Sequence, residues 1–324
     1  MVVAVKHAGR RPGRASPRVG LSTDRPARVR ETLEREIEAL TVNFGGVIAG
    51  KFEAIHQFRI SVRRLRGLIE LYQPLLQQNW FNRYREELRF LGRSVGALRD
   101  NDVLQQNLSG AAIKLDESLR DALAPLQETL TEWRRRQHEE TTALLRSPRY
   151  EALVHSLPAP AYKQPLSLHG SLTLPELIRP LVRAVERAGA KLNRRSSPSE
   201  FHRLRVKMKR LRYALEMLDG GKSQHAKKLA KELKSAQKIL GIQHDSVAAM
   251  GWLREFAASA VAPGPSLLAA GAAYELLLRR SLKLSRRAWK KWKAIRAGGT
   301  LQDIVAELPD SEGRLGDTIR AGAA

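Results

Sequence analysis

The chain has 324 residues, and at about 150 residues per domain this length predicts two domains. Lysine and arginine number 57 against 33 aspartate and glutamate, so the formal net charge is +24, which predicts anionic partners such as nucleic acid, an anionic membrane surface or polyphosphate. Hydrophobic residues make up 43%, which excludes a chain that is disordered throughout. The absence of cysteine excludes disulfide scaffolds, thiol catalysis and thiolate zinc sites.

Residues 1–24 are rich in arginine and contain no acid before Asp24. A secretory signal places its positive charge before the apolar segment, whereas here the short apolar run Val2–Val5 comes first. We predict a disordered basic arm, with an arginine-rich organelle presequence as the alternative. No stretch reaches the roughly 18 apolar residues of a transmembrane helix, so the expected location is the cytoplasm.

Apolar residues recur at helical spacing through almost the whole chain, and alternating, strand-like stretches are scarce. The pattern predicts an all-α protein, with N-caps at Ser197 and Ser223. The predicted helices lie near 26–43, 51–73, 80–96, 101–112, 116–147, 175–192, 198–218, 223–240, 245–259 and 265–296.

A proline-rich segment divides the chain into parts of similar length. Four of the 15 prolines follow Leu157, ending with Pro175, and proline at this density favours an extended connection. The predicted order is a basic arm at 1–24, a first helical bundle at 25–156, a linker at 157–175, a second helical bundle at 176–297 and a flexible tail at 298–324.

The two predicted bundles carry related sequences. The segment from His56 to Arg66 realigns on that from His202 to Arg212 at an offset of 146, keeping the histidine and most of the basic residues. A second pair of blocks follows in the same order at an offset of 145, so the repeat indicates a tandem duplication with an approximate two-fold axis.

The second pair of blocks is Gly96 with Asp100, and Gly241 with Asp245. Glycine is common just after a helix and aspartate is common as an N-cap, so each pair predicts a helix end followed by a new helix. The alternative role for each aspartate is to orient a neighbouring histidine or arginine.

Each repeat places its basic residues on one helix face. At about 100° per residue, one such face comprises His56, Arg59, Arg63 and Arg66, with Arg64 at its flank. The face in the second half comprises His202, Arg205, Lys209 and Arg212. An isolated basic face is usually only solvated, but a pattern that occurs twice, each time with a histidine among cations, favours a binding function.

The segment from Arg279 to Arg296 contains nine lysines and arginines and no acid. Its apolar face, which includes Trp289 and Trp292, is expected to pack on the second bundle, while the basic face extends the positive surface. Basic amphipathic helices with tryptophan also occur at membrane surfaces, which is the alternative.

The segments His56–Arg66, Gly96–Val103, His202–Tyr213 and Leu240–Asp245 together resemble the CHAD family (conserved histidine α-helical domain), over roughly residues 25–296. The resemblance implies two pseudo-symmetric four-helix bundles whose long basic helices line a central cavity or groove. It also implies binding of inorganic polyphosphate, often at polyphosphate granules. The residues implied to carry or assist binding are His56, Arg59, Arg63, Arg64, Arg66, Arg89, Arg93, His202, Arg205, Lys209, Arg210, Arg212, Lys234 and Lys238.

We therefore expect a non-enzymatic polyphosphate-binding protein with no catalytic residue, cofactor or metal ion. The first alternative is a nucleic-acid-binding protein, which is disfavoured because aromatic residues make up only 6% and those on the basic helices lie on the apolar face. The second is a metal-dependent enzyme acting on polyphosphate. Such chemistry needs carboxylates that hold Mg²⁺, and the basic faces contain none before Glu70 and Glu216.

Overall fold

The computed structural model describes residues 25–73, 76–157, 174–218, 223–259 and 264–307. These ranges contain helices and no β-strand, so the predicted all-α class is confirmed. The helices are α1 (Arg25–Ile48), α2 (Phe52–Leu71), α3 (Gln78–Ala112), α4 (Glu117–Asp121), α5 (Ala124–Leu145), α6 (Pro148–Ser156), α8 (Leu174–Ala190), α9 (Pro198–Leu218), α10 (Gln224–Ala257), α11 (Gly264–Ala297) and α12 (Thr300–Glu307).

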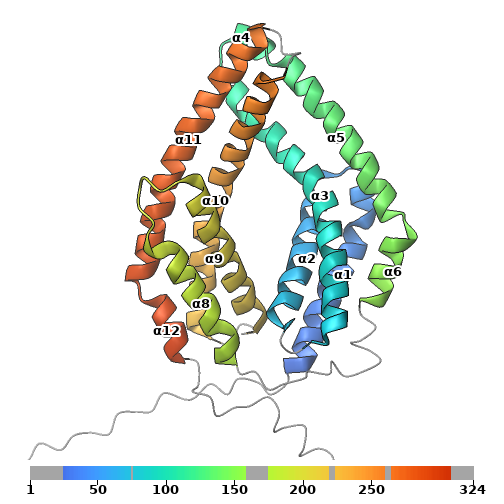
Figure 1. Ribbon diagram of the computed structural model, residues 1–324, viewed down its shortest axis with the longest axis vertical. Coiled ribbons are helices and arrows are strands. Elements are labelled where there is room, and N and C mark those ends of the chain that lie inside the picture. The colour runs from blue at the N-terminus through green and yellow to red at the C-terminus, as the bar shows by residue number, and fades with distance from the viewer. Residues whose placement is uncertain (1–24, 74–75, 158–173, 219–222, 260–263, 308–324) are drawn as a thin grey trace, which may run out of the picture.

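The helices form two arms that meet near α4, separate below it and approach each other again where α2 lies near α9 (Figure 1). One arm contains α1, α2, α3, α5 and α6, and the other contains α8 to α12. The arms thus follow the two halves of the sequence, whose duplication stays a prediction. The basic helices α2 and α9 belong to different arms and contact each other.

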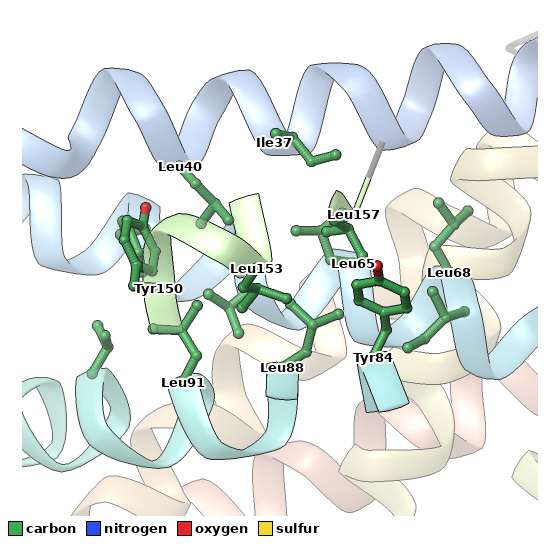
Figure 2. Close-up of a cluster of buried hydrophobic side chains, with 14 of the residues drawn as sticks. Ile37, Leu40, Leu65, Leu68, Tyr84, Leu88, Leu91, Tyr150, Leu153 and Leu157 are labelled. Atoms are coloured by element: carbon green, nitrogen blue, oxygen red, sulfur yellow. The ribbon is translucent and has the colours of Figure 1, made fainter. Parts of the chain in front are cut away.

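The first arm is held by a hydrophobic core between α1, α2, α3 and α6 (Figure 2). Leu65 of α2 and Leu88 of α3 are fully buried in it, and Tyr150 of α6 packs against the same cluster. Burial of each such side chain stabilises the fold by about 1.5–3 kcal/mol. The apolar face of α2 is therefore fixed in the core, which turns its basic face away from it.

The second arm has a corresponding core, made by α8 to α12. The fully buried side chains of α9 in this core are Phe201, Leu204, Met208 and Leu211. Trp292 of α11 is 1% exposed, and its Nε1 donates a hydrogen bond of 2.7 Å to the Gly189 carbonyl of α8. This contact confirms for Trp292 that the predicted apolar face packs on the second half of the chain, whereas Leu282 on the same predicted face is 51% exposed.

A third hydrophobic core joins the arms where α3 and α5 meet α10 and α11, and we call it the apical core. Its members include Leu104, Leu108, Leu126, Leu130, Ala249, Leu253, Ala273 and Leu277. This core was not predicted, because the hydrophobic pattern of a helix does not indicate which helix in the other half of the chain it packs against. It gives α3 and α10 a second anchoring point at the far end from the basic helices.

Two predicted helix ends are wrong. Helix α3 continues through Gly96, and helix α10 continues through Gly241. Asp100 and Asp245 therefore lie inside helices and cap none. The prediction used glycine as a local sign of a helix end. In the structure, each glycine instead leaves room for an arginine of a basic helix to pack against α3 or α10.

Two further boundaries differ from prediction. The helix expected over 116–147 is two helices, because the ring of Pro125 suits only the first turn, where α5 begins. The predicted flexible tail at 298–324 contains α12, whose Leu301 and Ile304 are buried in the second core. Residues 1–24, 158–173 and 308–324, which hold the predicted arm and most of the predicted linker and tail, lie outside the described residues.

Both predicted N-caps are confirmed. The Ser223 hydroxyl accepts a hydrogen bond of 3.0 Å from the Ala226 backbone N–H at the start of α10. At the start of α9, the Ser197 backbone N–H donates to the Glu200 carboxylate at 2.7 Å, while the Glu200 N–H donates back to the Ser197 hydroxyl. These reciprocal bonds form a capping box, which sets where the second basic helix begins.

The contact between Gly189 and Trp292 predicts the cost of one added methyl group. A Cβ at residue 189 would lie 2.2 Å from the indole ring, which is fully enclosed by the core. We expect Gly189→Ala to lower the free energy of unfolding by about 1–3 kcal/mol through overpacking. The matched control is Gly251→Ala inside α10, where the added Cβ meets nothing within 4 Å and is expected to stabilise by about 1 kcal/mol. Denaturant unfolding of both variants measures the difference, and equal stabilities would contradict the packing described.

Candidate anion-binding site

The two basic helices meet through polar contacts between residues far apart in the chain. Arg63 Nε of α2 donates a hydrogen bond of 2.8 Å to the Tyr213 hydroxyl of α9. Nearby, Arg210 Nη2 of α9 lies 3.4 Å from a Glu70 carboxylate oxygen of α2. The ring of Tyr213 also packs against Gly67, which has no side chain to keep α9 away. These contacts bring the two basic faces together into one site.

Lys209 lies at the centre of this site. Burial, together with the positive charges of Arg63 and Arg205, lowers its pKa from the ordinary 10.5 to about 6. Arg59 and Arg212 add to the effect. We call this group the cationic cluster, and its members are Arg59, Arg63, Arg205, Lys209 and Arg212.

The third helix of each arm supports an arginine of the cationic cluster. A Cβ at Gly96 of α3 would lie 3.7 Å from Arg59 Nε, and a Cβ at Gly241 of α10 would lie 3.9 Å from Arg205 Nη2. The missing side chains leave room for the guanidinium groups against the helix surface. Glycine inside a helix costs about 1 kcal/mol relative to alanine, so these positions favour a close approach over helix stability.

An aspartate one turn beyond each glycine lies beside the same arginine. Asp100 Oδ1 forms an ion pair of 2.9 Å with Arg59 Nη2. Burial raises the pKa of Asp245, and the charge of Arg205 opposes that rise. The predicted capping role of these aspartates is wrong, and the alternative role, orientation of an arginine, agrees with their positions.

Two histidines of the second arm face each other beside the cluster. His202 Nδ1 of α9 lies 3.2 Å from His244 Nδ1 of α10, with the ring centroids 4.5 Å apart. One nitrogen must donate and the other accept, so at least one ring is neutral. Burial and the charge of Arg205 lower the pKa of His244 to about 4, and burial also lowers that of His202. At neutral pH both rings are therefore neutral hydrogen-bonding groups.

The first arm has an arginine where the second has His244. The guanidinium of Arg99 lies over the ring of Phe52, 3.9 Å from its centroid. Burial and the charge of Arg99 lower the pKa of His56, so this histidine is also neutral at pH 7. Each arm therefore has one histidine at the edge of the cluster, with Arg99 near His56 in the first arm and His244 beside His202 in the second.

The predicted site residues outside the cluster fall into distinct positions. Arg64 points to α1, where its Nη1 lies 3.2 Å from the buried carboxylate of Glu36. Arg66 and Arg210 flank Glu70 at the junction of α2 and α9. The last four predicted residues are exposed on α3 and α10, on the helix faces that carry Gly96 and Gly241, and they are Arg89, Arg93, Lys234 and Lys238.

Three residues at the site were not predicted: Arg99, His244 and Tyr213. The 145-residue offset does pair Arg99 with His244, each before a repeated aspartate, but a histidine paired with an arginine is no common signal of a site. Tyr213 has no such signal, because its equivalent is Gly67 and its partner Arg63 is 150 positions away.

The arrangement suits an anion rich in oxygen atoms. Arginine and lysine supply charged N–H donors, and the neutral imidazoles supply further donors without adding repulsion. In the described part of the chain, no three histidine or carboxylate side chains are grouped as metal ligands. Among the same residues, no helix is long and apolar enough to cross a membrane.

The lowered pKa of Lys209 predicts that the affinity of the site for anions depends on pH. Below about pH 6 the free site holds a charged ammonium, whereas above it the bound anion must draw a proton onto the amine. We expect affinity for sulfate, whose own charge is constant from pH 5 to 9, to fall by up to about tenfold per pH unit above pH 6. Lys209→Arg places a permanent charge there and should flatten the profile in titration calorimetry. An equally steep profile in that variant would assign the pH dependence to another group.

A family model and two curated relatives match most of the chain. The family model of the CHAD domain matches residues 31–254. Uncharacterized proteins Rv2226 and MT2285, from two Mycobacterium tuberculosis strains (H37Rv and CDC 1551), are each 26% identical over an alignment of 286 positions that covers 82% of this chain. The chain spans about half (52%) of the length of these curated relatives.

Two solved structures share the fold. The CHAD domain from the plant Ricinus communis superposes with a TM-score of 0.69 at 27% identity, covering 91% of this chain and 97% of that domain. PptA from Streptomyces chartreusis superposes with a TM-score of 0.70 at 19% identity, covering 85% of this chain and all of PptA. The family model matches more than half of the chain, which shows that the chain belongs to the CHAD domain family.

Proposed function

We propose that this chain binds inorganic polyphosphate at the cationic cluster and catalyses no reaction of this ligand. The observation that carries the proposal is the convergence of cations from both arms around Lys209, which forms no ion pair with any described residue. Assembling such charges away from water is unfavourable, and an anion with closely spaced charges relieves the repulsion. The family resemblance independently implies this ligand.

Arginine is the main cation of the site, which supports a phosphate ligand. Its planar group can engage two phosphate oxygens at once, whereas lysine acts as a single charged point. Arg59, Arg63, Arg205 and Arg212 lie around Lys209 and so present several such groups from two directions. A chain of linked phosphates can satisfy them together, and each contact releases condensed counterions.

The aromatic residues of the site support a ligand without bases. Proteins that bind single-stranded nucleic acid in a sequence-tolerant way stack bases on exposed aromatic rings. Tyr213 is 4% exposed and lies beneath the guanidinium of Arg212, 4.4 Å from the ring centroid. Phe52 is covered by Arg99 in a similar way, and Phe58 is fully buried. The faces of these rings are covered by other side chains of the protein, so they offer no stacking surface to a base.

The carboxylates support a binding role over phosphoryl transfer. Asp100 is paired with Arg59, and Glu70 lies between Arg66 and Arg210. A metal ion bound there would be repelled by the neighbouring guanidinium groups, and at Asp100 it would also have to displace the 2.9 Å ion pair with Arg59. The proposal therefore assigns no catalytic residue. Following the family resemblance, it also includes an association with polyphosphate granules in the cytoplasm.

Competition between polyanions tests the proposal directly. Labelled long-chain polyphosphate is bound to the protein at about 150 mM salt and displaced with single-stranded DNA of matched total charge. We expect DNA to compete at least about tenfold less well per charge, because it offers a lower density of phosphate and bases that find no stacking surface. Equal competition would show a generic positive field and overturn the assignment to polyphosphate.

Removal of one arginine from each arm tests the location of the site. Arg59→Gln combined with Arg205→Gln removes two charge-assisted contacts, each worth about 1.5–3 kcal/mol, so affinity should fall by about 100-fold or more. The slope of log affinity against log salt should also become shallower by about two. The matched control, Arg286→Gln with Lys290→Gln, removes the same charge from exposed positions of α11 and should change affinity by less than about threefold. Equal losses in both double variants would contradict the site.

A further inference from the structure

The junction of α2 and α9 forms a cavity of about 340 Å³ that is partly open to solvent. Helix α8 closes it on one side through Leu181. Four basic side chains line the cavity, and two of them, Arg63 and Lys209, also belong to the cationic cluster. The other two are Arg66 and Arg210. The size falls at the lower end of the range for small-molecule pockets, roughly 300–1,000 Å³.

The cations of the cavity have donors to spare. Lys209 and Arg210 form no hydrogen bond with any described residue, and the buried Nε of Arg66 has no partner. Arg63 uses its Nε for the Tyr213 hydroxyl, which fixes its guanidinium at the cavity wall. Among these donors Arg66 Nε is the one that is buried without a partner, at a cost of about 1–3 kcal/mol, so an acceptor oxygen of a ligand is favoured beside it.

Part of the cavity wall is apolar. It is formed by Leu71 of α2, Leu181 of α8, and Val206 and Ala214 of α9. An inorganic phosphate chain is hydrated throughout and gains nothing from this surface, whereas a carbon skeleton gains about 25 cal/mol for each Å² of apolar area that it buries there. The wall therefore indicates a ligand with carbon atoms as well as phosphate.

Glu70 adds an acceptor at the edge of the cavity. Its two oxygens lie 3.8 Å from Arg66 Nη2 and 3.4 Å from Arg210 Nη2. Both separations exceed the usual hydrogen-bond range of about 2.7–3.2 Å, so the carboxylate keeps its capacity to accept hydrogen bonds. An acceptor beside cations repels phosphate but suits a hydroxyl group next to a phosphate.

We propose that this cavity binds a small organic phosphate, a molecule with one or two phosphate groups on a hydroxyl-bearing carbon skeleton. The cations hold the phosphate, Glu70 accepts from a hydroxyl, and the Leu71, Leu181 and Val206 surface covers the carbon atoms. Since Arg63 and Lys209 also serve the cationic cluster, such a ligand competes with polyphosphate. This last point alone rests on the proposed function.

Matched pairs of probes test the class of ligand. Titration calorimetry compares glucose 6-phosphate with orthophosphate, and ADP with pyrophosphate, so that each pair differs by the organic part. We expect at least one organic member to bind about tenfold more tightly than its inorganic partner. If both organic probes bind no more tightly than the inorganic ions, the cavity is only part of the polyanion site and the proposal is overturned.

Leu181→Phe tests the location, because the larger ring occupies the apolar side of the cavity and leaves every cation in place. We expect it to remove the preference for the organic probes while the affinity for long-chain polyphosphate stays within about twofold. The control for added bulk is Val42→Phe on the exposed surface of α1, and circular dichroism and thermal unfolding verify the fold of both variants. Retention of the preference in Leu181→Phe would place the organic ligand elsewhere and refute the proposal.

Glu70→Gln gives a second test that does not depend on repacking. Loss of the negative charge should leave orthophosphate binding equal or stronger, whereas glucose 6-phosphate should lose about fivefold or more because its hydroxyl loses a charged acceptor. A parallel rise for both probes would contradict the role of Glu70. Polyphosphate binding by the unaltered protein is measured separately, so failure of the proposed function and failure of the cavity proposal give different results.

Discussion

The rest of the structure depends on one unfavourable arrangement, a group of like charges held together away from water. Lys209 lies among four arginines, and burial removes the solvent that would screen them. The apolar faces of α2 and α9 hold these side chains in position, since each is anchored in the core of its own arm. Asp100 offsets part of the repulsion, and the lowered pKa of Lys209 removes one charge at neutral pH.

The helical fold and the two basic faces could be predicted from the sequence because both depend on local periodicity. The breaks at Gly96 and Gly241 could not, since a glycine that ends a helix and a glycine that admits an arginine look the same in one dimension. The apical core was invisible for a related reason: small side chains such as Ala249 and Ala273 give little periodic signal, and their partners lie in the other half of the chain.

The candidate site was predictable as a set of helix faces but not as a set of contacts. Arg64 is one position from Arg63, yet it points to Glu36 of α1, because one residue along a helix turns a side chain by about 100°. The hydrogen bond between Arg63 and Tyr213 joins the two arms and depends on how the arms are placed. Repeats in the sequence indicate which residues are equivalent, and only the packing of the halves shows which of them meet.

Because α3 and α10 are unbroken helices, a rotation of either helix at the apical core displaces its far end as a rigid body. From Gly96 to the end of α3 at Ala112 is about 24 Å of helix, and both ends of that span are engaged, one with Arg59 and the other in the apical core. A rotation of about 5° at the apical core therefore moves the Arg59 end by about 2 Å, comparable to the difference between a hydrogen bond and no contact. The separation of charges at one end of the molecule is thus set by the packing of alanines and leucines at the other.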